Sequence, residues 1–297
     1  MRARELMTER RNRATVNLDK MSPLELVTEM NREDAVVPRA IRRVLPEIAK
    51  AVNLVAERLA SGGRLIYVGS GTSGRIGALD ASECSPTFGV SARMVQFIIA
   101  GGAGALVKAT EASEDSAKKG RSDMAARRPG KRDVVVGIAA SGFTPYTISA
   151  LEYAGSKGAS TIAIACNRDS ALGKSADIRI EAEVGPEVLA GSSRLKAGTA
   201  EKLICNMITT GAMVRMGRVY SNFMVNMHVK NKKLNQRGIL ILASLVGVDR
   251  AVAKETLEKA GMSIPLALVM LKTHSNKAES ARRLRKANGN VRKAIEG

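Results

Sequence analysis

The chain has 297 residues, of which 45% are hydrophobic and 3% aromatic, and its 47 Lys and Arg against 28 Asp and Glu give a formal net charge of +19. This length and apolar content allow one large domain, or a large domain with a small one. No apolar run has the length of a membrane span, and the charged N-terminus lacks the apolar core of a secretory signal. We therefore expect a cytoplasmic protein without a membrane partner, which the three cysteines without a pairing pattern also favour.

The positive charge could attract nucleic acid, an anionic membrane or small anions. The cations are spread along the chain and Trp is absent, so few side chains could stack on single-stranded bases. A nucleic-acid partner is therefore not expected, and the charge is interpreted as a solvated basic surface. The two histidines, His228 and His274, are far apart in the sequence, which argues against a His-rich metal site.

The first forty residues are predicted to form an arm followed by a helix. The stretch Ser22-Pro23-x-Glu25 has the features of a helix start, with a capping hydroxyl, a proline in the first turn and an acid three residues after the cap. From Ile41 to Leu59 apolar residues recur at helical spacing, and Gly62-Gly63 ends the run. This periodicity predicts one helix over residues 41–59.

Short apolar runs that alternate with helical patterns follow. Such runs are typical of buried parallel strands that helices cover on both faces. Helical patterns lie between them, as in residues 145–158, and a long one covers residues 194–216. The runs that we expect to be strands begin at Arg64, Met94, Asp133, Ser160 and Asp177. The alternation predicts an α/β fold with a parallel sheet flanked by helices.

After about residue 240 the strand patterns stop. Short amphipathic helices separated by Gly, Pro and Asn are predicted from there to the end of the chain. We assign residues 1–40 to the N-terminal arm and helix, residues 41–235 to the α/β domain and residues 236–297 to a small all-helical subdomain.

Two loops at the predicted carboxyl edge of the sheet are rich in Gly, Ser and Thr. The first, Gly69-Ser-Gly-Thr-Ser-Gly74, follows the first strand, and Ala140-Ser-Gly-Phe-Thr-Pro145 follows the third. Ligands of open parallel sheets bind at this edge. Glycines let backbone N–H groups approach an anion, hydroxyls donate hydrogen bonds, and a helix N-terminus favours negative charge. The two loops together predict a phosphate cradle.

The spacing of Gly69, Gly71 and Gly74 also fits a dinucleotide site. Such a site usually has an acid at the end of the second strand, whereas that strand ends here in Ile99-Ala-Gly-Gly102. The hydroxyls in the first loop suit a phosphate monoester better than a pyrophosphate. A third polar segment, residues 191–202, is either an ordinary helix start with solvated cations or a further anion contact. The candidate phosphate ligands are Ser70, Thr72, Ser73, Ser141, Thr144, Ser192, Ser193, Arg194 and Lys196.

Long motifs connect these loops to a known family. The chain resembles the N-acetylmuramic acid 6-phosphate etherases, of the sugar isomerase (SIS) domain group, over nearly its whole length. The resemblance lies in Thr8-ERRN, Gly69-SGTSGRIGALDASEC, Glu111-ASEDS, Val136-GIAASGFTPY, Gly185-PEVLAGSSRLKAGTAEK and Asn222-FMVN. It implies a Rossmann-like SIS domain and a homodimer with a pocket near the subunit interface.

The resemblance also implies an activity, which is cleavage of the D-lactyl ether of N-acetylmuramic acid 6-phosphate. The products are N-acetylglucosamine 6-phosphate and D-lactate, no metal or organic cofactor is needed, and the reaction serves peptidoglycan recycling. The two functional glutamates of the family match Glu83 and Glu114. The chain departs from the family pattern at Ser85, Phe143, Asn226 and Lys230, where Pro, Arg, Asp and Thr are usual.

The chemistry explains why two carboxyl groups are needed. Once the sugar ring opens, the C1 aldehyde acidifies the C2 proton, and lactate can be eliminated from C3 before water adds. We assign Glu83 as the proton donor and Glu114 as the base, each step being worth about 10²–10⁴-fold. A carboxyl that stays protonated near neutrality needs a raised pKa, from burial or a nearby like charge. The alternatives are a non-catalytic sugar-phosphate regulator resembling the glucokinase regulatory protein, and a sugar-phosphate isomerase.

Overall fold

A computed structural model describes residues 6–108, 113–229 and 231–297. Glu111 of the Glu111-ASEDS motif and Lys230 lie outside the described residues. The chain divides into two compact units, Met1–Ser82 with Ala92–Gly211, and Glu83–Ser91 with Ala212–Gly297. These units follow packing and are not the three segments that the sequence predicts, so the limits at residues 40 and 235 stay predictions.

The first unit is built on a parallel sheet of five strands in the order β2-β1-β3-β4-β5. Central residues align across the sheet, with Tyr67 opposite Phe97 on one side and Val136 on the other. Its strands are β1 (Leu65–Gly69), β2 (Val95–Ile99), β3 (Val134–Ile138), β4 (Ser160–Ala165) and β5 (Ile178–Glu181). The strands and the α/β class that the apolar runs predict are confirmed.

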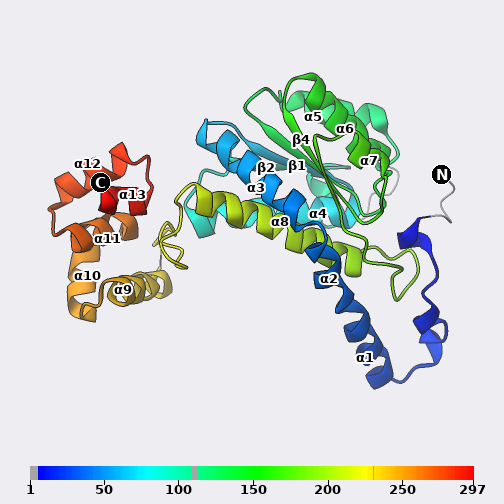
Figure 1. Ribbon diagram of the computed structural model, residues 1–297, viewed down its shortest axis with the longest axis horizontal. Helices are drawn as coiled ribbons and strands as arrows, with labels where there is room; N and C mark the ends of the chain where they lie inside the picture. Colours follow the sequence, from blue (N-terminus) through cyan, green and yellow to red (C-terminus); the bar gives the residue numbers. More distant parts are fainter. Residues whose placement is uncertain (1–5, 109–112, 230) are drawn as a thin grey trace. The chain divides into compact units, whose positions relative to one another are not determined.

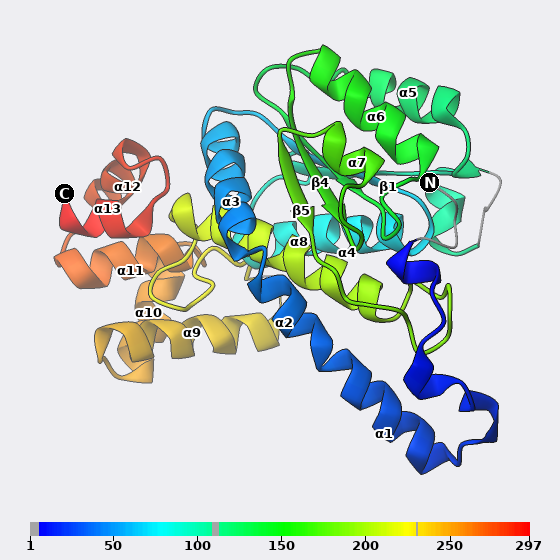
Figure 2. The ribbon, with the colours of Figure 1, turned by 45° about the vertical axis from the view of Figure 1, so that its right-hand side comes forward.

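Helices cover both faces of this sheet (Figures 1 and 2). Alternate residues of β1 point to opposite faces. Ile66 and Val68 belong to the core beneath α5 and α6, whereas the hydroxyl of Tyr67 donates to Asp80 on α4 at the other face. The covering helices are α5 (Ala117–Ala126), α6 (Pro145–Ser156) and the short α7 (Ala171–Lys174) on one face, and α3 (Leu45–Ala60), α4 (Gly71–Phe88) and α8 (Lys196–Arg215) on the other.

The N-terminal segment begins with short 3-10 turns, η2 (Met7–Glu9), η3 (Arg13–Thr15) and η4 (Leu18–Lys20). Helix α1 (Pro23–Asp34) then starts with the predicted capping box between Ser22 and Glu25. The single helix predicted over residues 41–59 is wrong, because Ile41 belongs to α2 (Val36–Arg42), which ends at Arg42, and α3 begins anew at Leu45. Pro46 explains the break, since proline has no N–H to donate inside a helix and is favoured in a first turn.

The second unit is helical, as the pattern after residue 240 predicts. Its core contains Leu242, Leu257, Leu268 and Val291, all fully buried. Its helices are α9 (Lys232–Val246), α10 (Arg250–Lys259), α11 (Ile264–Thr273), α12 (Lys277–Lys286) and α13 (Val291–Glu296). Among the described residues, no helix combines the length and apolarity needed to cross a membrane.

Candidate phosphate site

The carboxyl ends of β1 and β3 define the candidate site. Strand β1 has β2 on one side and β3 on the other, so the chain reverses its direction of travel across the sheet at this point. Ligands of doubly wound sheets bind in the crevice at such a reversal. Both predicted phosphate loops leave the sheet here, residues 69–74 at the end of β1 and residues 140–145 after β3.

Glycines shape the first loop. A Cβ on Gly69 would lie 2.9 Å from the Ile138 carbonyl oxygen and 2.9 Å from the Gly74 nitrogen, so a side chain there would push β3 and the start of α4 apart. Gly71 has φ +52°, a backbone conformation that residues with a side chain rarely adopt. This turn starts α4 immediately after the strand. The first amides of a helix have no intrahelical acceptors, so they are available to an anion.

Each hydroxyl of the first loop has a different environment. The Ser70 hydroxyl is half-buried and donates to Glu114 Oε2 at 3.3 Å. The Ser73 hydroxyl is buried and lies 2.8 Å from Oε1 of Glu201 on α8. Thr72 lies beside Gly198, where an added Cβ would be 3.5 Å from the Thr72 methyl group. The loop is therefore braced from two sides, by the segment that carries Glu114 and by the start of α8.

The second loop turns at Gly142, whose φ is +76°. The Ser141 hydroxyl accepts the Phe143 N–H at 3.1 Å, and Thr144 stands at the N-cap of α6 without using its hydroxyl to cap the helix. Asn167, after β4, donates to the carbonyl oxygens of Ala140 and Ser141. The Asn167 side-chain amide therefore fixes the second loop, although no motif in the sequence marks this residue.

The third polar segment approaches the first loop through the start of α8. Ser192, Ser193 and Arg194 form the turn before the helix, and the Gly198 N–H donates to the Ser193 carbonyl at 2.9 Å. Lys196 has a different environment, because its side chain is only 2% exposed and its Nζ lies 2.5 Å from Glu33 Oε2. In this conformation the ammonium group pairs with α1, and its role in phosphate binding stays a prediction.

Two buried glutamates, Glu187 and Glu201, lie at the start of α8 and in the segment before it. Glu187 is fully buried and accepts the N–H groups of Lys196 and Ala197 at 3.0 and 2.9 Å. Burial raises the pKa of Glu187, and these two hydrogen bonds oppose the rise. Neither Glu187 nor Glu201 was a candidate from the sequence, although both lie in the Gly185-PEVLAGSSRLKAGTAEK motif. A charged residue in a helical pattern is usually solvated, so only the packing could reveal them.

The N-terminal arm is tied to the same region. Thr8 accepts a hydrogen bond from Asn167, and Asn12 donates to Glu33, the partner of Lys196. The Thr15 hydroxyl donates to the Val188 carbonyl. Asn12 also donates to the Pro186 carbonyl, so Asn12 of the Thr8-ERRN motif and Thr15 hold the arm against the loop that precedes α8.

The two predicted catalytic glutamates are both exposed in the single chain. Glu114 lies beside the first loop through its bond from Ser70, and its backbone carbonyl accepts the Tyr146 N–H. Glu83 is the thirteenth residue of α4, about 18 Å along the helix axis from Gly71 at 1.5 Å per residue. Glu83 belongs to the second compact unit, whereas Glu114 belongs to the first.

Asp80 carries a buried carboxyl group. It lies in the middle of α4, where it accepts hydrogen bonds from Tyr67, Asn206 and Thr209. Burial raises its pKa, and these hydrogen bonds oppose the rise. Cys84, on the same helix, is also buried. Asp80 therefore joins β1, α4 and α8 from within the core.

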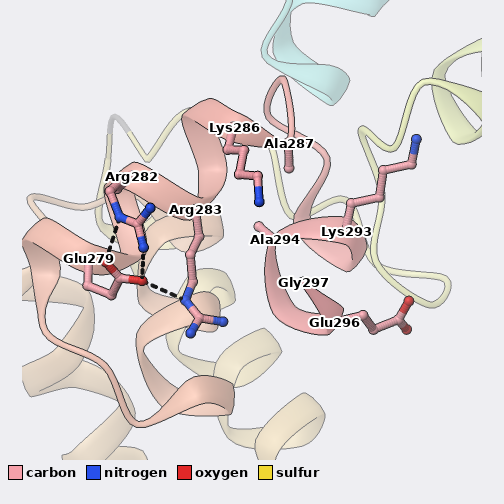
Figure 3. A pocket seen from close by; sticks show the side chains of 9 residues that line it. All are labelled: Glu279, Arg282, Arg283, Lys286, Ala287, Lys293, Ala294, Glu296 and Gly297. Atoms are coloured by element: carbon pink, nitrogen blue, oxygen red, sulfur yellow. Dashed lines mark hydrogen bonds and ion pairs between the residues drawn. The ribbon is translucent and has the colours of Figure 1, made fainter.

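A separate cavity of about 500 Å³ lies among α12 and α13 of the second unit (Figure 3). Arg282 and Arg283 both point to the carboxylate of Glu279, and the hydrogen bond from Arg282 leads in lowering the pKa of Glu279 to about 2. None of the predicted site residues lines this cavity. Within the described ranges, no cluster of His, Cys, Asp and Glu could hold a metal ion.

Comparison with known proteins identifies the type of domain in the first unit. The SIS domain family matches residues 110–210, and the N-terminal SIS domain of the glucokinase regulatory protein matches residues 47–155. A solved phosphosugar isomerase involved in capsule formation from Bacteroides fragilis has the same fold, with a TM-score of 0.54 and 19% identity over 70% of this chain and 98% of that one.

Curated relatives extend the similarity to nearly the whole chain. The N-acetylmuramic acid 6-phosphate etherase of Oenococcus oeni is 50% identical over 98% of each chain. The enzyme of the same name from Clostridium beijerinckii is 47% identical over 99% of this chain and 96% of its own, and that from Symbiobacterium thermophilum is 51% identical over 91% and 90%. Identity at this level, over both units, shows that the chain belongs to the N-acetylmuramic acid 6-phosphate etherase family.

Proposed function

We propose that this protein is a lyase that cleaves the D-lactyl ether of N-acetylmuramic acid 6-phosphate, giving N-acetylglucosamine 6-phosphate and D-lactate. The observation that carries the proposal is the hydrogen bond between Ser70 and Glu114, in a chain of this family. It supports a site in which a phosphate-binding loop and a carboxylate serve the same ligand. The other predicted phosphate ligands, on the second loop and before α8, complete the proposed cradle.

The reaction begins with the open-chain form of the sugar. Glu114 removes the C2 proton, which the C1 aldehyde acidifies, and Glu83 donates a proton to the departing lactate oxygen. Water then adds to the unsaturated aldehyde with the two roles reversed. Each proton transfer contributes about 10²–10⁴-fold to the rate.

A homodimer completes this site. Glu83 belongs to the second compact unit and Glu114 to the first, so the packing within either unit does not explain how both carboxyls reach one sugar. Two-fold symmetry would supply Glu83 from one subunit and Glu114 from the other, in a pocket near the interface. Burial in that pocket would also keep the donor protonated near neutral pH.

The cell-biological setting follows from the substrate. N-acetylmuramic acid derives from the cell wall, so the enzyme would act in peptidoglycan recycling in the cytoplasm, where sugar phosphates are retained. Its substrate is a small molecule, and the proposal requires neither a metal nor an organic cofactor.

The direct test is to supply N-acetylmuramic acid 6-phosphate and measure D-lactate. Wild-type protein should release it, and Glu83→Gln and Glu114→Gln should each lower turnover at least 10²-fold while sugar-phosphate binding persists. Mixing equal amounts of the two variants should restore about a quarter of the wild-type rate, because half of the dimers are mixed and one of their two sites is intact. Absence of lactate from the wild type would refute the activity, and absence of complementation would refute only the shared site.

A sugar-phosphate regulator is the second candidate, favoured by the match of residues 47–155 to the glucokinase regulatory protein domain. It would bind sugar phosphates at the same loops without consuming them. Binding of N-acetylmuramic acid 6-phosphate with no release of lactate would favour it. Interconversion of sugar phosphates without lactate would instead indicate an isomerase.

A further inference from the structure

A buried carboxyl group lies directly behind the first phosphate loop. Glu201, in the second turn of α8, is fully buried, and its Oε1 is 2.8 Å from the Ser73 hydroxyl in the first turn of α4. Its second oxygen, Oε2, is buried without a hydrogen-bond partner, and no cation forms a salt bridge with it in the described part of the chain. A carboxylate buried with one hydrogen bond is unfavourable, so the arrangement suits the neutral acid.

The charged and titratable groups around Glu201 also favour its neutral form. Glu187, in the segment before α8, adds negative potential, while Cys166 follows β4 and Cys205 lies one turn further along α8. Lys196, the buried cation on the same helix, is paired with Glu33. Burial, only partly offset by the Ser73 hydrogen bond, raises the pKa of Glu201 to about 8. Both thiols have pKa values raised well above 9.0, so they stay neutral over the same pH range.

The protonation state of Glu201 decides what Ser73 can do. A serine hydroxyl has one proton to donate and can accept two hydrogen bonds. An ionised Glu201 can only accept, so it takes the Ser73 proton and leaves none for a ligand. A neutral Glu201 carries its own proton, which it can donate to Ser73 Oγ, and the Ser73 hydroxyl is then free to donate elsewhere.

We propose that Glu201 is a positioning residue for phosphate binding, which as a neutral acid donates to Ser73 and leaves the Ser73 proton for a phosphate oxygen at the start of α4. The inference rests on the proposed function, since it assumes that a sugar phosphate occupies this loop. Ionisation of Glu201 also places a negative charge one hydroxyl group away from the phosphate dianion. Both effects weaken binding, so phosphate binding and protonation of Glu201 support each other.

The linkage predicts a pH dependence of affinity with a definite sign. A phosphate monoester is a dianion above about pH 6, so its own charge is constant from pH 7 upward. If only the neutral acid binds well, the apparent Kd equals the intrinsic Kd divided by the neutral fraction. With the Glu201 pKa at about 8, the apparent Kd should rise about tenfold between pH 7 and pH 9.

Titration calorimetry with N-acetylglucosamine 6-phosphate, which cannot lose lactate, tests the proposal. The wild type should show the tenfold rise and should take up protons on binding near pH 8, as measured in buffers of different ionisation enthalpy. Glu201→Gln should keep the pH 7 affinity within about threefold, because its amide donates to Ser73. It should lose both the tenfold rise in Kd and the proton uptake, because the amide cannot ionise. Ser73→Ala should bind more weakly at pH 7, and its Kd should rise less than tenfold between pH 7 and pH 9, because only the charge of ionised Glu201 then acts on the phosphate.

Asp80→Asn is the matched control, since Asp80, on α4, is another buried carboxyl with a raised pKa and accepts hydrogen bonds from Tyr67, Asn206 and Thr209. It should keep the wild-type pH dependence. A wild-type Kd that is constant from pH 7 to pH 9, or an unchanged slope in folded Glu201→Gln, would overturn the proposal. If Glu201→Gln fails to fold, the wild-type proton uptake and Ser73→Ala decide it. A wild type that binds no sugar phosphate would refute the proposed function itself, whereas binding without a pH dependence refutes only the role of Glu201.

Discussion

Replacing Lys196 should destabilise the first unit. Lys196 Nζ lies 2.5 Å from Glu33 Oε2, and the two side chains are 2% and 17% exposed. Lys196→Met keeps most of the aliphatic volume but leaves Glu33 without its cation. Removing one partner of a buried pair costs about 3–5 kcal/mol, and because Glu33 retains some solvent contact we expect about 3 kcal/mol. Urea unfolding should report this loss, with a melting temperature lower by about 6–12 °C.

A double-mutant cycle separates the pair from the packing of the lysine stem. Lys196→Met combined with Glu33→Leu should recover most of the loss, since no unpaired charge remains. Lys50→Met, at an exposed lysine of α3, should change stability by less than about 0.5 kcal/mol. If Lys196→Met is as stable as the wild type and instead loses sugar-phosphate affinity, the Lys196–Glu33 pair does not stabilise the first unit. The ammonium group then serves the ligand, as the sequence predicts.

The same pair has a pH signature. Burial raises the pKa of Glu33, but the hydrogen bond and charge of Lys196 outweigh it, and the net shift is downward from 4.5. A depressed pKa means that the ion pair stabilises the fold above pH 4.5 and ceases to do so as the pH falls through the folded-state pKa. The stability difference between wild type and Lys196→Met should therefore be constant near neutrality and shrink below pH 4.5.

Two further substitutions test the supports of the site. Glu187→Gln should cost about 2–3 kcal/mol in urea unfolding, because an amide nitrogen cannot accept the N–H that one carboxylate oxygen now accepts at the start of α8; unchanged stability would contradict this. Gly69→Ala should cost about 1–3 kcal/mol and weaken sugar-phosphate binding, since its Cβ would meet backbone atoms at 2.9 Å. Gly130→Ala, where a Cβ meets nothing within 4 Å, should leave binding unchanged, and equal effects of the two would argue against the steric explanation.

The sequence by itself determined the fold class and where the candidate phosphate site would lie. Buried strands such as Val134–Ile138 are continuous apolar runs because helices cover both faces of the sheet. Such runs can be recognised in the sequence alone. The loops at Gly69 and Ser141 are equally local, since tight turns need glycine and phosphate binding needs hydroxyls and free amides. Parallel strands bring both loops to one edge by necessity, so their convergence was predictable too.

Only the tertiary structure decided which charged side chains are buried and what they contact. Lys196 and Glu201 lie in the first two turns of α8 and Glu187 lies in the segment before it, and in the sequence all three resemble solvated residues. The fold nevertheless buries them, with Lys196 paired to Glu33 of α1 and Glu201 against Ser73 of α4. Periodicity shows that a residue belongs to a helix, but burial depends on elements far away in the sequence, such as Glu33 for Lys196, 163 residues apart. The energy of a buried charge is set by those distant partners, and for that reason the carboxyl behind Ser73 emerged only from the fold.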